Sequence, residues 1–122
     1  MAYTYDPQNI FAKILRGEIP NTTVLETAHS LAFRDLYPQA PVHVLVIPKG
    51  AYVCYDDFAQ NATDTEIADF TRAIGEVCKM EGVDAEGYRM ISNAGDDGVQ
   101  EVPHLHVHIL GGRALGRMLA KG

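Results

Sequence analysis

Three histidines alternate with apolar residues in the segment 103–112, whose sequence is Pro-His-Leu-His-Val-His-Ile-Leu-Gly-Gly. A period of two is typical of a β-strand, so we predict a strand with His104, His106 and His108 on one face and apolar residues on the other. At about 3.3 Å per residue, the outer two histidines would stand roughly 13 Å apart, with His106 between them. The segment holds three of the five histidines in the chain, which makes it the first candidate for a functional site.

Three roles are open to these imidazoles. A structural role is the least favourable, because each buried ring nitrogen would need a hydrogen-bond partner. A metal site is the second, because His-x-His on a strand can place two nitrogens on one zinc ion, with His43 as a third ligand. The third is chemistry on phosphorus, since neutral imidazole is a nucleophile and an adjacent protonated imidazole can donate to a phosphate oxygen or leaving group.

Composition narrows the class of protein. A chain of 122 residues suits one domain, and its net charge of −6 argues against nonspecific binding to nucleic acid or to an anionic membrane. No apolar run approaches the roughly 20 residues needed to cross a bilayer, and the first residues do not resemble a secretory signal. Cys54 and Cys78 are isolated, so we expect two reduced thiols in a cytoplasmic protein.

The elements that must position the histidines can be read from the patterns around them. A short first helix is expected, with Asp6 as its cap and Gly17 as its end. Strands are predicted for 22–26, 31–36, 42–47 and 88–92, whereas 51–62 is expected to be irregular or one loose turn. A long helix is predicted for 64–81, because Thr63 and Glu66 form a capping box at its start.

The strand predicted for 42–47 is the most apolar in the chain, and His43 interrupts it. A lone histidine in such a strand is more often structural than catalytic. A central place in the sheet could nevertheless bring His43 close to the three later histidines. Short loops join most of the predicted strands, which favours antiparallel pairing and an α+β fold.

Several segments resemble one known family. The run 104–110 is similar to the His-φ-His-φ-His-φ-φ motif of histidine-triad (HIT) proteins, where φ is an apolar residue. Further segments are similar to the Hint branch of that family, namely 10–14, 33–36, 38–43, 46–49, 92–95, 98–102 and the Gly-Gly-Arg at 111–113. The resemblance covers nearly the whole chain, and its set of motifs is highly specific.

This resemblance implies a single HIT domain over residues 1–122, with 113–122 as a C-terminal tail. The implied fold is a five-stranded antiparallel sheet with one long and one short helix, which pairs into a ten-stranded sheet in a homodimer. The implied activity is hydrolysis of the P–N bond of purine nucleoside 5′-phosphoramidates, of the AMP-amine or AMP-lysine type, through a covalent nucleotidyl-histidine. No cofactor is required, zinc is not expected, and neither nucleic acid nor membrane is an expected partner.

The resemblance also implies roles for individual residues. His106 matches the nucleophile, His104 and His108 match flanking histidines that contact phosphate and orient it, and His43 matches a fourth active-site histidine. Asp35 matches the acid that holds the ribose hydroxyls. The apolar pocket for the base is matched by Ile10, Phe11, Ile14, Phe33 and Leu36. The loop on the phosphate side is matched by Asn93, Val99 and Gln100.

Two loop positions and the tail depart from the family pattern. Val99 stands where a second glycine is common, and Glu101 stands where some members have a phosphate-binding serine. We expect the Glu101 carboxylate to point away from the phosphate or toward a cationic leaving group. The tail carries Arg117, has no tryptophan and resembles bacterial-type tails.

Two alternative functions stay open. One is a non-catalytic purine-nucleotide-binding or scaffolding protein. The other is a dinucleoside polyphosphate hydrolase, against which the pair Gly111 and Gly112 after the motif argues.

Overall fold

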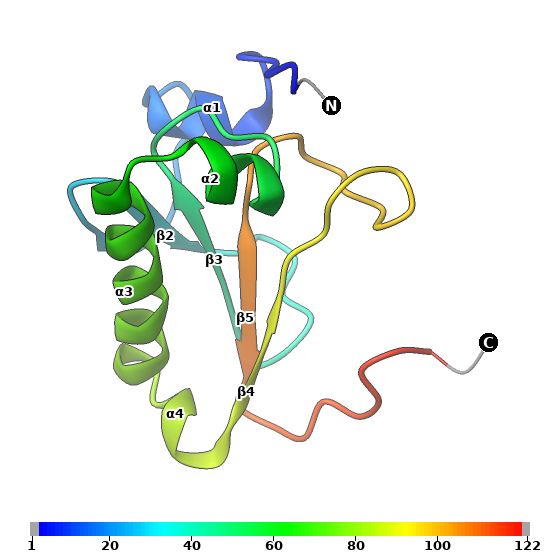
Figure 1. Ribbon diagram of the computed structural model, residues 1–122. Helices are drawn as coiled ribbons and strands as arrows, with labels where there is room; N and C mark the ends of the chain where they lie inside the picture. Colours follow the sequence, from blue (N-terminus) through cyan, green and yellow to red (C-terminus); the bar gives the residue numbers. More distant parts are fainter. Residues whose placement is uncertain (1–2, 121–122) are drawn as a thin grey trace.

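The computed structural model describes residues 3–120, and its centre is a five-stranded antiparallel sheet (Figure 1). The strands are β1 (Thr23–Glu26), β2 (Ser30–Arg34), β3 (Val42–Pro48), β4 (Tyr88–Ile91) and β5 (Val107–Gly111), in the spatial order β1-β2-β3-β5-β4. The predicted α+β class and antiparallel sheet are therefore confirmed. No helix in the described part of the chain is long and apolar enough to span a membrane.

Strand β3 lies in the middle of the sheet, between β2 and β5. Its run of apolar residues suits this place, because both of its faces are covered and six of its seven residues are buried. The register with β5 pairs His43 with Leu110 and Leu45 with His108. Side chains alternate along a strand, so His43 and His108 face the same side of the sheet.

Helix α3 (Asp64–Met80) covers one face of the sheet. The predicted capping box is present, since Thr63 and Glu66 each accept a hydrogen bond from the other's backbone N–H. The apolar side of α3 packs on the alternate residues of β3 and β5 that point toward it, including Val44, Val46 and Ile109. This layer holds the larger part of the hydrophobic core and fixes the position of β5.

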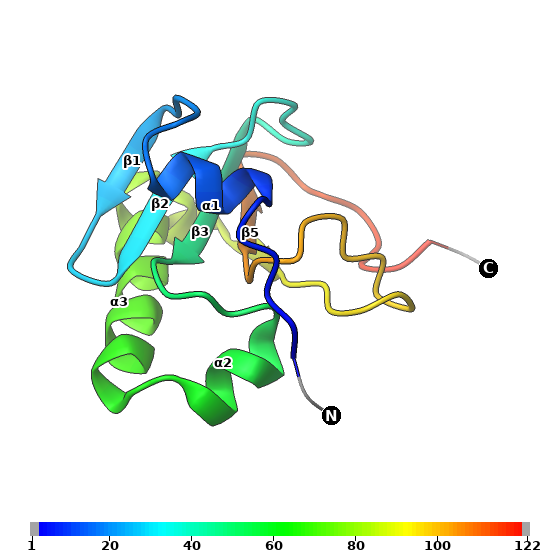
Figure 2. The same ribbon diagram turned by 90° about the horizontal axis from the view of Figure 1, so that it is seen from above.

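The opposite face of the sheet is covered by helix α1 (Ile10–Leu15), which Figure 2 shows lying across the strands. Phe11 and Ile14 of α1 pack against Phe33 and Leu45 in a second, smaller core. The cap of α1 differs from the prediction: Asn9, and not Asp6, caps it by accepting from the N–H of Ala12. The backbone carbonyl of Asp6 instead accepts from Asn9 in the preceding turn.

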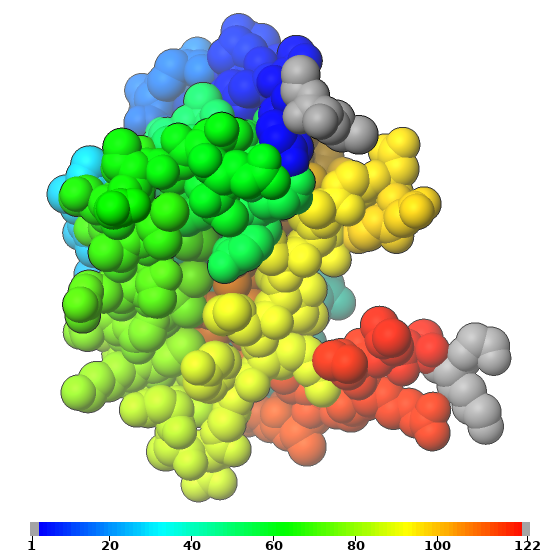
Figure 3. All heavy atoms as spheres, viewed as in Figure 1, coloured from blue at the N-terminus to red at the C-terminus, as the bar shows by residue number. Residues whose placement is uncertain are grey.

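Two short helices and the start of β5 were not predicted. Helix α2 (Tyr55–Asn61) occupies much of the segment expected to be irregular, and helix α4 (Val83–Glu86) links α3 to β4. Strand β5 begins only at Val107, so His104 and His106 lie in the irregular segment before it, although the alternation of faces continues through them. Beyond Gly111 the described tail has no helix or strand and projects from the body (Figure 3). Residues 121 and 122 of the predicted tail lie outside the described residues.

Candidate active site

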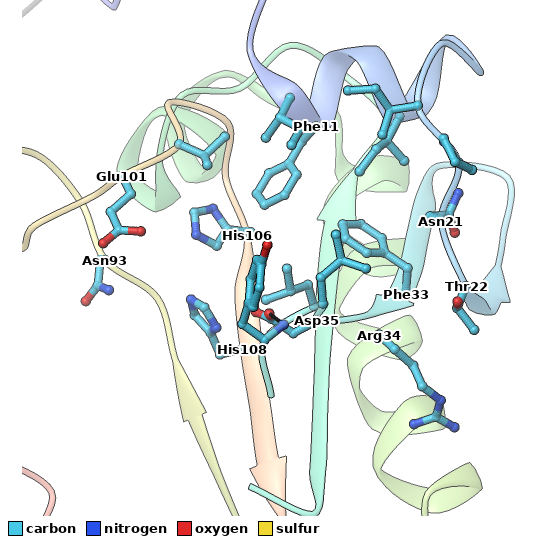
Figure 4. A pocket seen from close by; sticks show the side chains of 18 of the residues that line it. Phe11, Asn21, Thr22, Phe33, Arg34, Asp35, Asn93, Glu101, His106 and His108 are labelled. Carbon is cyan, nitrogen blue, oxygen red and sulfur yellow. Dashed lines mark hydrogen bonds between the residues drawn. The ribbon is translucent and has the colours of Figure 1, made fainter. Parts of the chain in front are cut away.

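A cavity of 590 Å³ lies between α1, the end of β2 and the start of β5. Its volume is in the range of sites that hold a small organic ligand. His106 and His108 line it together with Asp35, and Figure 4 shows these side chains gathered below Phe11. One wall is apolar and is formed by Ile10, Phe11, Ile14, Phe33 and Leu36, as predicted, and by Ile19, Leu45 and Val102, which were not.

The structure brings most of the predicted site residues to this cavity, but three of them do not line it. Asn93 and Val99 lie in its wall with the apolar residues, His106, His108 and Asp35. His43 lies one layer behind, in contact with His108. His104 and Gln100 are the other two, and their side chains bind protein groups instead.

The ring of His106 is held in a single tautomer by the backbone of His104. Its Nδ1 lies 2.8 Å from the carbonyl oxygen of His104, and because a carbonyl only accepts, Nδ1 carries the proton. Nε2 is then the nitrogen with a free lone pair. Burial lowers the pKa of His106, although the hydrogen bond to His104 and the charges of Asp35 and Glu101 oppose that shift. The ring is therefore neutral at pH 7 and has a nucleophilic nitrogen.

His108 presents the opposite kind of nitrogen. The backbone N–H of Gln39 donates to Nδ1 of His43 at 3.0 Å, so the proton of neutral His43 is on Nε2. That Nε2–H donates to Nδ1 of His108 at 2.9 Å, which leaves the proton of neutral His108 on its own Nε2. Burial and the neighbouring His106 and His43 lower the pKa of His108 to about 4. His108 is thus a neutral hydrogen-bond donor beside the nucleophile.

His104 contacts the pocket only through its neighbours. It is fully buried; its Nε2–H donates to the carbonyl of Pro48 at 2.8 Å, and its Nδ1 lies 2.6 Å from the hydroxyl of Tyr5. Burial lowers the pKa of His104 to about 4. Both ring nitrogens are occupied, so the expected contact between His104 and phosphate is not available in this arrangement. The part of His104 that acts on the site is its carbonyl oxygen, which holds His106.

Asp35 follows directly after β2 and closes the side of the cavity opposite the loop that carries Asn93. One carboxylate oxygen accepts from the N–H of Tyr37 at 2.8 Å, and the other lies 3.4 Å from Nε2 of His43. Each oxygen keeps an unused lone pair. The carboxylate can therefore accept further hydrogen bonds from a ligand.

Asp35, His43 and His108 also form a group whose ligand atoms lie within 4.8 Å of one another. This group fits a metal ion poorly. The Gln39 N–H holds Nδ1 of His43 as an acceptor and so keeps a proton on Nε2, the atom that faces the other two residues. A metal ion would have to displace that proton and break the bond to Gln39. The zinc site considered from the sequence also required nitrogens of His104 or His106 on the same ion, and this group contains neither.

The loop 93–102 forms the remaining wall and contains a strained residue. Gln100 holds the loop together, because it accepts from the N–H of Gly95 and donates to the carbonyls of Val53 and Val102. It is thus structural here, whereas a phosphate contact was expected. Val99 adopts φ +56°, in the left-handed region that β-branched residues avoid. Glu101 lines the cavity, and Figure 4 shows its carboxylate beside Asn93 on the side of His106 and His108.

Several supporting residues were missed by the sequence analysis. The hydroxyl of Ser92 donates to the backbone carbonyl of His106, and the backbone of Gln39 fixes His43. Asn21, Thr22 and Tyr37 add polar groups to the cavity wall. None of these residues stands in a pattern that indicates a site. They come close to the cavity and its histidines only in the folded chain. Gln39 and Ser92 do lie in segments that resemble the HIT pattern.

Comparisons with known proteins identify the family of this chain. The family model described as "HIT domain" matches residues 16–115. An uncharacterized HIT-like protein of Azospirillum brasilense is 62% identical over 100% of both chains. The purine nucleoside phosphoramidase of Escherichia coli is 40% identical over 93% of this chain and 94% of its own. The crystal structure of a HIT family hydrolase from Legionella pneumophila superposes with a TM-score of 0.77 and 40% identity, covering 88% of this chain and 95% of that one. The chain belongs to the HIT family.

Proposed function

We propose that this HIT family hydrolase cleaves the P–N bond of purine nucleoside 5′-phosphoramidates through a nucleotidyl group on His106. The observation that carries the proposal is the pairing of opposite tautomers. His106 offers a lone pair on Nε2, and the adjacent His108 offers a proton on Nε2. Their ring centroids are 5.1 Å apart, so a single phosphoryl group can meet both nitrogens. The phosphoramidase from Escherichia coli supports this choice of substrate.

In the first half of the reaction, Nε2 of His106 forms a bond to phosphorus and the P–N bond to the amine breaks. The electron pair of that bond goes to the leaving nitrogen. The substrate supplies the necessary proton, since its nitrogen is protonated before the bond breaks. His108 donates its Nε2–H to a phosphoryl oxygen as charge develops there. The His104 carbonyl, 2.8 Å from Nδ1, stabilises the positive charge on the modified His106 ring.

In the second half, water attacks the same phosphorus and the bond to Nε2 of His106 breaks. The electron pair returns to Nε2, and one proton of the water leaves with the nucleoside monophosphate or passes to solvent. The tautomers of His106 and His108 are restored by the same carbonyl and the same His43 hydrogen bond. The net reaction consumes one water and releases one amine.

The rest of the cavity suits a nucleoside. Phe11, Ile14 and Phe33 belong to an apolar wall that can bury a purine ring. Asp35 has free lone pairs that can accept hydrogen bonds from two ribose hydroxyls. With the base on this wall and the ribose on Asp35, the phosphate falls between His106 and His108. Asn93 lies on the far side of that position.

The charges around the cavity favour a cationic leaving group. Glu101 and Asp35 both line it, while the lining Arg34 is engaged with Glu81 in a bidentate ion pair at 2.6 and 3.0 Å. With neutral histidines, the wall is therefore acidic on both sides of the phosphate. A positively charged amine beside Glu101 offsets this repulsion, which supports substrates of the AMP-lysine type.

The decisive experiment compares the wild type with His106→Ala on an adenosine 5′-phosphoramidate. Removing a covalent nucleophile lowers kcat by about 10³-fold or more. His29→Ala is the matched control, because His29 lies in the turn between β1 and β2 and does not line the cavity. Mass spectrometry of the quenched wild type should detect one nucleotidyl group, absent from His106→Ala. Equal turnover by the two proteins would refute the mechanism. Tight AMP binding without any turnover would support the non-catalytic alternative.

We also propose that two copies of the chain pair through β4. This strand is at the edge of the sheet, where among residues 3–120 it pairs only with β5. Its Tyr88 and Met90 are 48% and 56% exposed, which is unfavourable for an uncovered edge. Pairing of two β4 strands would cover them and join the sheets. Light scattering should then give twice the chain mass of 13.4 kDa, and Met90→Arg should lower it toward one chain.

The reaction needs no metal ion in this proposal, because the hydrogen bonds of His43 oppose one. Dialysis against a chelator should leave kcat unchanged. We place the enzyme in the cytoplasm, since Cys54 and Cys78 are both free and buried, as suits a reducing compartment. Fractionation of the source cells would test that placement.

A further inference from the structure

The segment before helix α1 crosses the molecule beside α2 and reaches His104. Figure 2 shows this segment running past the start of α2. Tyr3 is hydrogen-bonded to Asp56 in the first turn of α2, and Asp6 holds Asn9 at the other end. Between these anchors, the side chain of Tyr5 turns inward and is part-buried against the ring of His104. Nothing in the proposed reaction uses this segment.

The contact between Tyr5 and His104 is directional. Nε2 of His104 donates to the Pro48 carbonyl, and burial keeps the ring neutral, so Nδ1 carries no proton. The Tyr5 hydroxyl must therefore donate to Nδ1, at 2.6 Å. The rings meet edge-on with centroids 5.5 Å apart. Without the hydroxyl, Nδ1 would be a fully buried acceptor with no protein donor.

The position of His104 determines the position of the nucleophile. The His104 carbonyl is the acceptor that holds Nδ1 of His106, and its backbone N–H donates to the Val102 carbonyl at 2.9 Å. No strand ladder fixes this part of the chain, because β5 begins at Val107. Isolated hydrogen bonds hold it instead, among them the one from the Leu105 N–H to the Tyr52 carbonyl at 2.8 Å and the one from Ser92 to the His106 carbonyl. The His104 side chain adds two more: it donates to the Pro48 carbonyl at the end of β3 and accepts from Tyr5.

We propose that Tyr5 is a positioning residue for the reaction, which acts through His104 to orient the ring of His106. The proposal rests on the proposed function, because it assigns Tyr5 to the same nucleophile. Tyr5 does not line the cavity, so it affects the attack on phosphorus and not the binding of the nucleotide. Its loss should therefore change kcat and leave KM unchanged.

The test compares Tyr5→Phe with Tyr3→Phe. Each variant removes one hydroxyl from the same segment, but only Tyr5→Phe removes the bond to His104, because Tyr3 binds Asp56. We expect kcat of Tyr5→Phe to fall roughly tenfold with KM within about twofold, as for a nucleophile displaced by a fraction of an ångström. Tyr3→Phe should keep the kcat of the wild type.

A second measurement follows His104 directly. In ¹⁵N NMR of histidine-labelled protein, Nδ1 of His104 should move downfield in Tyr5→Phe, toward a nitrogen that accepts no hydrogen bond, and should stay in place in Tyr3→Phe. If Tyr5 had a merely structural role, Tyr5→Phe would lower stability but would not combine a lower kcat at constant KM with the shift of His104 Nδ1. The proposal is overturned if kcat is unaffected in Tyr5→Phe, or if both variants lose kcat equally. A wild type that hydrolyses no phosphoramidate would refute the proposed function itself, whereas an active wild type with an unaffected Tyr5→Phe refutes only the role of Tyr5.

Discussion

Acidification from pH 6.5 toward pH 4 should destabilise this protein through its buried histidines. Burial lowers the pKa of His104 to about 4 in the folded chain, against 6.5 in the unfolded chain. Between these values the unfolded state binds more protons than the folded state. The free energy of unfolding therefore decreases as the pH falls from 6.5 toward 4.

The loss can be worked out for a change from pH 7 to pH 5. Between pH 6.5 and pH 5, His104 is protonated in the unfolded chain but neutral in the folded one. Over these roughly 1.5 units the free energy of unfolding falls by about 1.36 kcal/mol per pH unit, so His104 accounts for a loss of about 2 kcal/mol. The pKa of His108 is lowered to the same value, which adds about 2 kcal/mol more. A total near 4 kcal/mol is a large part of the roughly 5–15 kcal/mol that stabilises an ordinary domain.

Urea unfolding of the wild type and His104→Gln at both pH values isolates the share of His104. The amide N–H₂ of glutamine can replace Nε2–H as the donor to the Pro48 carbonyl but does not titrate. Between pH 7 and pH 5, the free energy of unfolding of the variant should therefore decrease by about 2 kcal/mol less than that of the wild type, whatever the stability of the variant at pH 7. Equal losses in the two proteins would refute the reasoning, because they would show that His104 is solvated or protonated when folded.

Three further outcomes follow from the site. The acid limb of kcat/KM should have its midpoint below pH 6.5, because burial lowers the pKa of His106 and keeps its Nε2 unprotonated; a midpoint at or above 6.5 in a pH–rate profile would contradict this. Val99→Gly should raise the free energy of unfolding by about 0.5–1 kcal/mol in thermal or urea unfolding, since relief of the left-handed strain exceeds the entropy cost of glycine. Glu101→Gln should raise kcat/KM for a substrate with a neutral leaving amine by roughly fivefold and reduce the preference for a cationic one, because the carboxylate lines an otherwise uncompensated cavity wall. An unchanged ratio of the two substrates would remove Glu101 from leaving-group selection.

Patterns that depend on one element were predictable from the sequence, and those that depend on several were not. The capping box at Thr63 and the apolar run of β3 lie within single elements, and both are observed. Helix α2 was missed because Cys54, its N-cap, makes no side-chain capping bond. The side chain of Asp57, in the first turn, instead accepts from the N–H of Val53, the residue before the N-cap, and this contact has no simple sequence signature.

The first helix shows the same limit at its start. Asp6 followed by Pro7 is a strong local signal for a helix beginning at residue 7. Asn9 caps the helix instead, and its own amide donates to the Asp6 carbonyl, so both residues belong to one turn. The apolar face of α1 packs on Phe33, and the segment before it passes beside α2. The helix therefore begins at the later of two acceptable caps, where both contacts are made.

The roles of the three alternating histidines could not be separated by their spacing. On a neutral imidazole one nitrogen donates and the other accepts, so the partner of one nitrogen decides what the other offers. His106 donates to a carbonyl and is left with a lone pair, whereas His108 accepts from His43 and is left with a proton. His104 uses both nitrogens within the protein and offers neither to a ligand.

The partners that impose these differences come from separate parts of the chain, namely the end of β3, the start of β3 and the segment before α1. An alternating strand can place three imidazoles on one face, but it gives them equivalent surroundings. The asymmetry arises because β5 starts only at Val107, which frees the His104 carbonyl from the ladder to accept from His106. The irregular backbone before β5 is thus what converts a repeated residue type into one nucleophile, one donor and one support.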